Sequence, residues 1–204
     1  MSELRPELQK ICEWIEPGSR VLDLGCGDGA LLEWLQKNRQ VTGYGVEINQ
    51  QDVLSCLKKN VNIIQTDLDA GLTDFADASF DYVIMTQALQ ALHRPDKTLD
   101  EMLRVGRKSI VTFPNFGLWK CRLYLSINGR MPVSKALPAQ WYDTKNIHLC
   151  TVNDFENFCA QRSMTISKRG IVDYNHRPSA LMKLWPNLFG EVALYQLDEK
   201  KNAI

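Results

Sequence analysis

The residues best suited to bind a ligand form one short run, in which Asp23, Gly25, Gly27 and Gly29 alternate with other residues and Cys26 lies among them. Glycine has no side chain, so it adopts left-handed turn conformations and lets a ligand approach the main chain closely. Carboxylates beside such a turn attract cationic groups and repel anionic ones. The run therefore predicts a turn at which a ligand with positive charge meets the backbone.

Two classes of nucleotide ligand fit the glycine spacing. The pattern Gly25-x-Gly27-x-x-Ala30 also matches the fingerprint of dinucleotide-binding proteins, which hold a pyrophosphate at the start of a helix. Here Asp23 and Asp28 flank the turn, and each would oppose a pyrophosphate by on the order of 1 kcal/mol at short range. S-adenosylmethionine and its demethylated product S-adenosylhomocysteine bring no phosphate, and the sulfonium compound is net positive. The acidic turn favours them over NAD; an NAD-linked dehydrogenase and a glycine turn without a ligand are the alternatives.

Polar groups suited to an adenosine follow the next two predicted strands. Glu47 ends the strand that follows the glycine turn. In nucleotide-binding α/β folds, an acidic residue about 20 residues past the turn binds the two hydroxyls of a ribose, and Glu47 matches that position. Asp67 can accept a hydrogen bond from the adenine amino group while the N–H of Leu68 meets a ring nitrogen, and Ile48 stands beside Glu47. The alternatives are an exposed strand end for Glu47 and a helix cap for Asp67.

Candidates for contact with a substrate, or with the remainder of the ligand, are fewer. Thr86 and Gln87 end the fourth predicted strand, and the uncharged Gln87 suits the methionine end of the ligand or a substrate, or else satisfies local backbone groups. His148 is the best-placed candidate base; alternatively it buttresses a helix start, because residues 151–154 form a predicted capping box. Two other histidines are weaker candidates in loops, His93 and His176.

These candidates need a scaffold that brings the ends of separate strands together. Apolar segments typical of strands alternate with helical ones through most of the chain. The alternation predicts an α/β fold with a doubly wound, mostly parallel sheet, since right-handed crossovers place the carboxyl ends on one edge. One intervening helix, 50–59, is expected to bury Val53, Leu54 and Leu57. The expected strands are 21–24, 40–48, 62–65, 80–85, 109–113, 164–171 and 193–197.

The region from about 117 to 150 breaks this alternation. Its apolar residues show no clean periodicity, and its charged residues are mostly basic. An insertion after the fifth strand would lie over the carboxyl edge as a lid or a partner surface, unless it is ordinary irregular packing. A second apolar stretch, 178–189, would be a partner patch if exposed. We expect residues 1–204 to form a single domain that includes both.

Composition narrows the classes of function. The 204 residues include 24 basic and 24 acidic side chains, so no global field attracts nucleic acid or an anionic membrane. No apolar run approaches the ~20 residues of a membrane span, and the polar start of the chain is unlike a signal peptide. Six cysteines without a C-x-x-C pair indicate reduced thiols and no metal site. These features predict a cytoplasmic protein.

The order of these motifs resembles a known superfamily. Four of them, all within residues 20–113, are similar to those of class I S-adenosylmethionine-dependent methyltransferases: V-L-D-L-G-C-G-D-G, G-V-E-I, Q-T-D-L and F-D-Y-V-I-M. Two further runs, W-I-E-P-G-S-R and W-Y-D-T-K-N-I-H-L-C-T, resemble the MetW family of methionine biosynthesis, and this likeness covers nearly the whole chain. The resemblance implies a seven-stranded sheet with an antiparallel last strand, ligand roles for Gly25, Gly27, Glu47 and Asp67, and action together with a homoserine O-acyltransferase. One departure is Gly106, which stands where many methyltransferases have Leu-Lys-Pro-Gly-Gly.

The resemblance leaves two classes of function open. Methyl transfer needs little beyond alignment because its donor is already activated, so the lack of an obvious base is no argument against an enzyme. The sequence has neither an Asn-Pro-Pro-aromatic run nor a Pro-Cys nucleophile, so an enzyme would act on a small molecule. A binding protein would instead sense S-adenosylmethionine and regulate the acyltransferase through two states of different affinity. We favour the regulator, with an active methyltransferase as the alternative.

Overall fold

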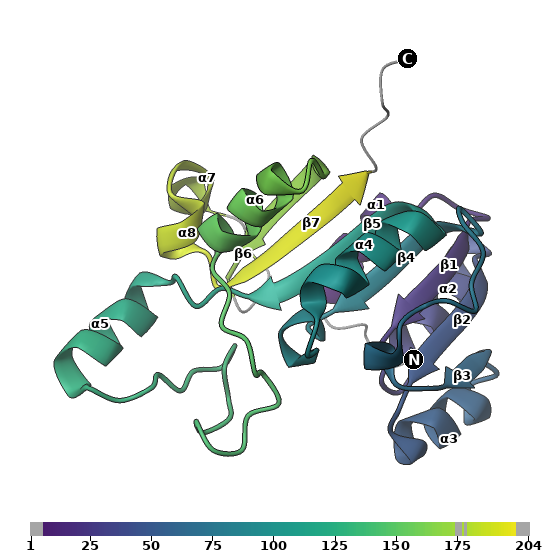
Figure 1. The fold of residues 1–204 in the computed structure, drawn as a ribbon, viewed down its shortest axis with the longest axis horizontal. Coiled ribbons are helices and arrows are strands. Elements are labelled where there is room, and N and C mark those ends of the chain that lie inside the picture. Colours follow the sequence, from purple (N-terminus) through teal and green to yellow (C-terminus); the bar gives the residue numbers. More distant parts are fainter. Residues whose placement is uncertain (1–5, 174–176, 178, 199–204) are drawn as a thin grey trace.

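The computed structural model describes residues 6–173, 177 and 179–198, which form a seven-stranded sheet between two layers of helices (Figure 1). The strand order is β3-β2-β1-β4-β5-β7-β6. Strands β1 to β5 pair in parallel, whereas β7 is antiparallel to both β5 and β6. The predicted doubly wound sheet with an antiparallel last strand is confirmed. The strands are β1 (Arg20–Leu24), β2 (Thr42–Glu47), β3 (Ile63–Gln65), β4 (Phe80–Thr86), β5 (Gly106–Pro114), β6 (Thr165–Val172) and β7 (Val192–Asp198).

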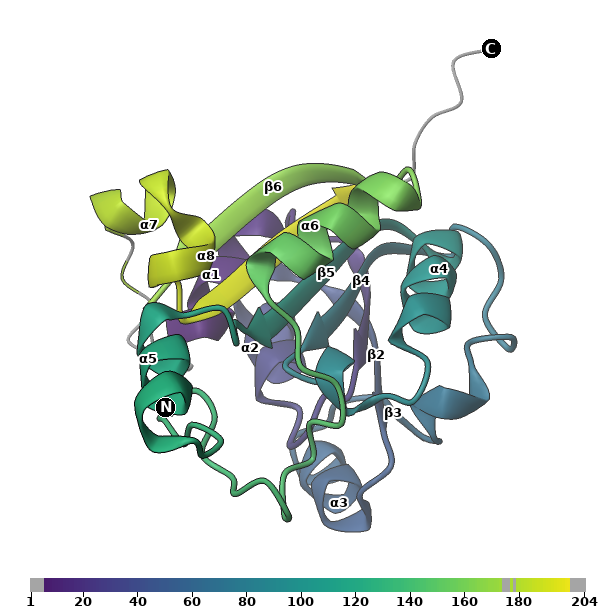
Figure 2. The same ribbon diagram turned by 60° about the vertical axis from the view of Figure 1, so that its left-hand side comes forward.

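Helices cover both faces of the sheet (Figure 2). One core cluster packs α1, α2 and α3 on one face through Ile11, Leu32 and Cys56. A second cluster packs α4 and α6 through Met102 and Phe155. Among the described helices, none is long and apolar enough to cross a membrane. The helices are α1 (Pro6–Trp14), α2 (Ala30–Arg39), α3 (Gln50–Lys58), α4 (Pro95–Val105), α5 (Trp119–Asn128), α6 (Val152–Gln161), α7 (Ala180–Leu184) and α8 (Pro186–Phe189), with short 3₁₀ helices η1 (Leu68–Ala70) and η2 (Leu89–Ala91).

The central strands are nearly continuous runs of buried side chains, as expected for a sheet that is covered on both faces. Residues 82–85 of β4 are all buried, and so are the last six residues of β5. Phe113 of β5, Phe155 of α6 and Tyr195 of β7 form an aromatic cluster with ring centroids 4.7 to 6.0 Å apart. This core fixes the positions at which β4, which pairs with β1, and its other neighbour β5 end.

Helix α3 presents a different face to the sheet from the one that we predicted. Asn49 caps its start, and its buried residues are Val53 and Cys56. Leu54 and Leu57 are exposed, so the predicted burial of these two residues was wrong. The neighbouring edge strand β3 is only three residues long, and a short strand offers little surface for a broad apolar helix face to cover.

The chain passes from α4 directly into β5, without a loop. Gly106 is the first residue of β5, at the position where the sequence departs from many methyltransferases. A Cβ atom at Gly106 would lie 2.5 Å from a methyl carbon of Val83 in β4. The tight passage from helix to strand therefore requires glycine.

The insertion at residues 117–150 contains one helix, α5, which the sequence pattern did not predict. An irregular segment follows α5 up to residue 150. Both ends of the insertion meet at the buried Asn115, whose Oδ1 accepts hydrogen bonds from the backbone N–H of Gly117 (2.9 Å) and of Val152 (3.1 Å). In Figure 1, α5 and the segment after it project from the carboxyl end of β5, away from the sheet.

Candidate functional site

The glycine turn follows β1 and is held against the end of β2. Gly25, Gly27 and Gly29 all have left-handed φ angles, of 70°, 54° and 75°. The N–H groups of Gly25 and Cys26 both donate to the carbonyl of Val46, at 2.8 and 3.1 Å. The N–H of Gly29 donates to the carbonyl of Cys26 at 3.1 Å and closes the turn before α2 begins. The predicted succession of strand, glycine turn and helix is confirmed.

The three glycines of the turn face different surroundings. A Cβ atom at Gly25 would lie 3.1 Å from the Cβ of Ala88, which follows β4. A Cβ atom at Gly29 would lie 2.8 Å from the sulfur of Cys56 in α3. Around Gly27 no atom lies within 4 Å of the Cβ position. Gly25 and Gly29 therefore permit close packing, whereas Gly27 leaves bare main chain open to an approaching molecule.

Glu47, at the end of β2, is fixed beside this open position by the backbone. Its Oε2 accepts a hydrogen bond from the N–H of Gly27 at 2.9 Å. Its Oε1 accepts from the N–H groups of Ile48 at 2.8 Å and Asn49 at 2.9 Å. Three N–H groups thus hold the carboxylate in place. An ionised carboxylate has about four lone-pair sites, so it retains capacity for further donors.

The side chains that follow β2 and β3 flank the same edge of the sheet. Ile48 is 61% exposed, which is unusual for so large an apolar residue. Leu68 is half-buried, and its Cδ1 lies 3.9 Å from the Cβ position of Gly25. Asp67 caps η1, where its Oδ1 accepts from the N–H of Asp69 at 2.9 Å. The cap expected as the alternative for Asp67 is present, and it leaves the exposed carboxyl group at the edge.

Asp23 and Cys26 lie beneath the turn. Asp23 is 1% exposed, and in the sheet its neighbours are Gly45 and Ile84. The thiol of Cys26 points toward α3, with its sulfur 3.9 Å from that of Cys56. Burial raises the pKa of the Cys26 thiol, and the Asp23 carboxylate raises it further. Cys26 is therefore a neutral packing residue whose N–H and carbonyl already have partners within the site.

Thr86 and Gln87 complete the edge at the end of β4. Gln87 has a left-handed φ of 55°, which is uncommon for a residue other than glycine. Its N–H donates to both the carbonyl and the hydroxyl of Thr112 in β5, at 3.0 and 3.1 Å. Thr86 is half-buried, and the side chain of Gln87 is exposed. The turn therefore presents the Gln87 side chain at the carboxyl edge.

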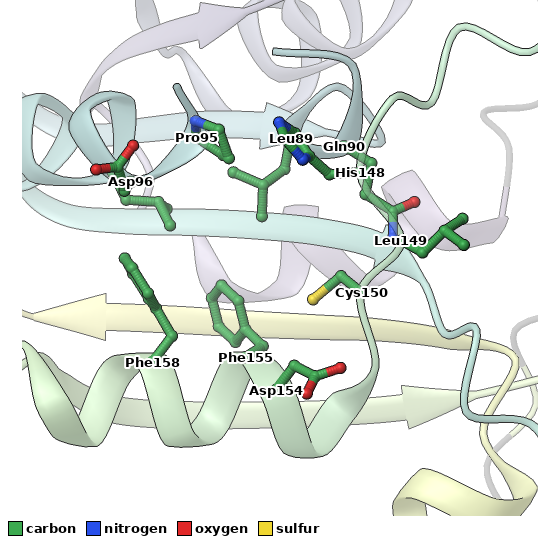
Figure 3. Close-up of a pocket in the computed structure, with 11 residues that line it drawn as sticks. Leu89, Gln90, Pro95, Asp96, His148, Leu149, Cys150, Asp154, Phe155 and Phe158 are labelled. Atoms are coloured by element: carbon green, nitrogen blue, oxygen red, sulfur yellow. The ribbon is translucent and has the colours of Figure 1, made fainter. Parts of the chain in front are cut away.

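His148 lies in a different setting, at the rim of a cavity between α4 and α6 (Figure 3). The N–H groups of Ile147 and His148 both donate to the carbonyl of Gln90 in η2, at 2.9 and 3.0 Å. The His148 ring is exposed, and its Nε2 lies 3.4 Å from the carbonyl of His93. The cavity has a volume of about 350 Å³, and its apolar walls include Leu89, Pro95, Leu99, Phe155 and Phe158. The capping box at residues 151–154 is confirmed just beyond it.

One ionic pair near the edge was missed by the sequence reasoning. Asp69 accepts hydrogen bonds from the backbone N–H of His93 at 2.9 Å and pairs with its ring Nδ1 at 2.7 Å. This hydrogen bond raises the pKa of His93 and lowers that of Asp69. The two residues are far apart in sequence and follow strands that are not neighbours in the sheet, so no spacing signals the pair. His176 lies outside the described residues.

Several solved structures with the same fold are methyltransferases. A SAM-dependent methyltransferase from Archaeoglobus fulgidus superposes with a TM-score of 0.70 at 18% identity, covering 96% of this chain and 92% of its own. An S-adenosylmethionine-dependent methyltransferase from Mesorhizobium loti superposes with a TM-score of 0.64 at 17% identity, covering 95% of this chain and 96% of its own. The [4+2]-cyclase SpnF gives 0.65 at 15% identity, with 95% and 80% covered. The fold is therefore that of the class I S-adenosylmethionine-dependent methyltransferases, a fold that does not by itself determine the chemistry.

Sequence comparison identifies the family within this class. The model of the family described as methionine biosynthesis protein MetW matches residues 5–197. The bifunctional methionine biosynthesis protein MetXA/MetW of Rhodopirellula baltica is 33% identical over 200 residues, which are 94% of this chain but 32% of that protein. The chain belongs to the MetW family. A demethylmenaquinone methyltransferase from Renibacterium salmoninarum is 33% identical over 108 residues, 50% of this chain and 45% of its own.

Proposed function

We propose that the carboxyl edge of β1 to β4 binds S-adenosylmethionine or S-adenosylhomocysteine. Glu47 accepts hydrogen bonds from the two ribose hydroxyls, which suits a carboxylate already held in place by the backbone. The exposed side chain of Ile48 packs on the adenine face. Asp67 accepts from the adenine amino group, and the N–H of Leu68 meets a ring nitrogen. Gly27 lets the rest of the ligand lie along the bare main chain.

The remaining predicted contacts concern the methionine end of the ligand. Gly25 and Gly29 shape the turn that this end approaches, and Thr86 and Gln87 line it from β4. The buried Asp23 contributes negative charge beneath a ligand with a sulfonium and an ammonium group. Cys26 was also predicted to touch the ligand, and we now assign it to support of the turn because its thiol points toward α3.

The hydrogen bond between Gly27 and Glu47 is the single observation that carries the choice of ligand. In dinucleotide-binding proteins, N–H groups at the start of the helix donate to the pyrophosphate. Here the N–H of Gly27 donates to a carboxylate oxygen at 2.9 Å. A pyrophosphate at this place would meet a negative charge within hydrogen-bond distance of its donor, which opposes binding. A ligand without phosphate that carries positive charge meets no such barrier.

We further infer that the chain acts in methionine biosynthesis by regulating a homoserine O-acyltransferase. Support comes from the Rhodopirellula baltica relative, whose name joins MetXA to MetW in one bifunctional protein. This chain matches 32% of that relative, which leaves room for a separate MetXA part, and we identify that part with the acyltransferase. Occupancy of the adenosyl site would then alter acyltransferase activity only if the ligand binds two states with different affinity.

An active methyltransferase on a small molecule is the second candidate. The cavity beside His148 supports it, because its size and apolar walls suit a small acceptor with an imidazole at the rim. S-adenosylmethionine, when bound, supplies an activated methyl group, so the chain would mainly have to position the acceptor. Within this candidate we propose His148 as the base that accepts the acceptor's proton at a ring nitrogen.

Two measurements test these proposals. Calorimetric titration should show binding of S-adenosylmethionine and S-adenosylhomocysteine and none of NAD; the reverse preference would overturn the ligand assignment. The purified acyltransferase should then be assayed alone, with this chain, and with both this chain and the ligand. An acyltransferase that is fully active alone and indifferent to the chain would eliminate the regulatory role. A methylated product that is lost in His148→Ala would establish the enzyme instead.

A further inference from the structure

The insertion exposes an unusual concentration of large apolar side chains. Of the 18 large apolar side chains that are exposed in the described part of the chain, 11 lie within residues 119–149. Ile127, Trp141 and Tyr142 are 71%, 74% and 70% exposed. Monomeric proteins rarely expose contiguous apolar patches of more than a few hundred square ångströms unless the patch is an interaction site. Residues 119–149, hereafter the docking segment, are therefore the main candidate for an interaction surface in the described part of the chain.

Helix α5 of the docking segment is apolar on more than one side. Its buried residue is Cys121, whereas Leu123, Tyr124, Leu125 and Ile127 are exposed. Successive residues in a helix point in directions about 100° apart, so these side chains cover more than half of its circumference. A helix that lies on a membrane surface keeps its apolar residues on one face. An apolar helix with several such faces is typical of one buried in protein, which favours a groove in a partner protein.

The charges of the docking segment restrict the partner further. The segment carries five basic residues and one acidic residue, a net charge of +4, in a chain whose total formal charge is zero. The basic residues are Lys120, Arg122, Arg130, Lys135 and Lys145, and the acid is Asp143. Two copies of this chain that met through the segment would bring like charges together, and such contacts are disfavoured. The complementary surface is an apolar groove with an acidic rim.

We propose that the docking segment is the surface on which the homoserine O-acyltransferase binds, with α5 inserted into an apolar groove of that enzyme. This assignment rests on the proposed regulatory function and names the surface that it uses. The segment has 31 residues, and a stable protein interface takes about 20–30 residues from each side. Because Asn115 bonds both ends of the insertion, the partner meets a segment whose base is fixed to β5 and α6.

The test is a binding measurement between this chain and the purified homoserine O-acyltransferase. The variant carries Ile127→Asp and Trp141→Ala, and both positions are more than 70% exposed, so the fold does not depend on them. The matched control is Leu57→Asp, because Leu57 is a large apolar residue on α3 that is 55% exposed. We expect the double variant to bind at least about 30-fold more weakly, as for loss of central interface residues. The control should bind within about threefold of the wild type.

Every other result of this binding measurement contradicts one specific part of the proposal. If the wild type binds the acyltransferase and the double variant binds equally well, the docking segment is not the interface, although the partnership stands. If the wild type does not bind at all, the partnership fails, and this assignment fails with it. If the double variant instead loses self-association in sedimentation, or loses binding to vesicles that contain phosphatidylserine, the segment serves a second copy or a membrane. Unchanged affinity for S-adenosylmethionine shows that the double variant is folded.

Discussion

Replacement of Glu47 by glutamine should weaken ligand binding strongly and lower the stability of the free protein only slightly. The carboxylate accepts three backbone hydrogen bonds, two at Oε1 and one at Oε2. Glutamine has one carbonyl oxygen, so if that oxygen keeps the bonds to Ile48 and Asn49, the amide NH₂ faces the N–H of Gly27. Two donors then oppose each other, and one ribose hydroxyl loses its acceptor.

The expected loss of affinity follows from these contacts. A hydrogen bond to a charged group contributes about 1.5–3 kcal/mol. Loss of one such bond to the ribose, together with weakening of the other, should reduce the binding free energy by about 2–4 kcal/mol. This corresponds to a Kd for S-adenosylmethionine that is about 30- to 1,000-fold higher. Loss of the bond to Gly27 costs the free protein about 1 kcal/mol, a decrease in Tm of about 2–4 °C at this chain length.

Calorimetry with S-adenosylmethionine measures the first effect, and thermal unfolding of the free protein measures the second. Asp74→Asn is the matched control, because Asp74 is exposed and the substitution removes the same charge. The control should bind within about twofold of the wild type. If Glu47→Gln binds S-adenosylmethionine within about threefold of the wild type, with or without the decrease in Tm, the assignment of Glu47 to the ribose is wrong.

Three further predictions follow from other contacts. Gly29→Ala should lower Tm more than Gly27→Ala: both strain a left-handed residue by about 1–2 kcal/mol, but only at Gly29 does the new methyl meet a sulfur, at 2.8 Å. Gly27→Ala should instead cost more ligand affinity, by calorimetry, because its methyl fills the open position. His93→Gln should destabilise the protein in urea at about pH 5.5 and not at about pH 9. The pairing with Asp69 raises the pKa of His93, so its stabilisation of the folded state is complete below the ordinary pKa of 6.5 and is lost as pH rises through the raised pKa. At low pH the same stabilisation is lost as pH falls through the lowered pKa of Asp69. Phe155→Ala should cost about 3–5 kcal/mol in chemical denaturation because it empties the aromatic core between α6 and β5.

The glycine turn and the strand ends were predictable because local residue types determine them. Gly25 and Gly29 occupy backbone that other residues adopt only with strain, and buried strands such as β4 are continuous apolar runs. The same logic placed Glu47 at the end of β2, although nothing in its spacing predicted the hydrogen bond to Gly27. Apolar pattern predicts which elements form, whereas contacts between loops depend on tertiary geometry.

The errors also have physical causes. Leu54 and Leu57 follow a helical pattern that normally faces a core, but α3 lies at the edge of the sheet beside a short strand, so they remain exposed. Helix α5 was missed because its apolar residues show no single buried face, and periodicity detects helices only through such a face. The pair of His93 and Asp69 joins two loops that the sequence places 24 residues apart. Each case depends on what lies next to the element, and a local pattern does not contain that information.

Asn115 has a consequence for how such a protein can change over evolutionary time. Its single amide ties together the residues just before and just after the long excursion that carries α5. Whatever path the intervening chain takes, it leaves and rejoins the sheet at this one residue. Each doubling of the length of such a loop raises the free energy of loop closure by only about 0.6 kcal/mol. The sequence and length of this insertion can therefore change, while the sheet and its carboxyl edge stay the same.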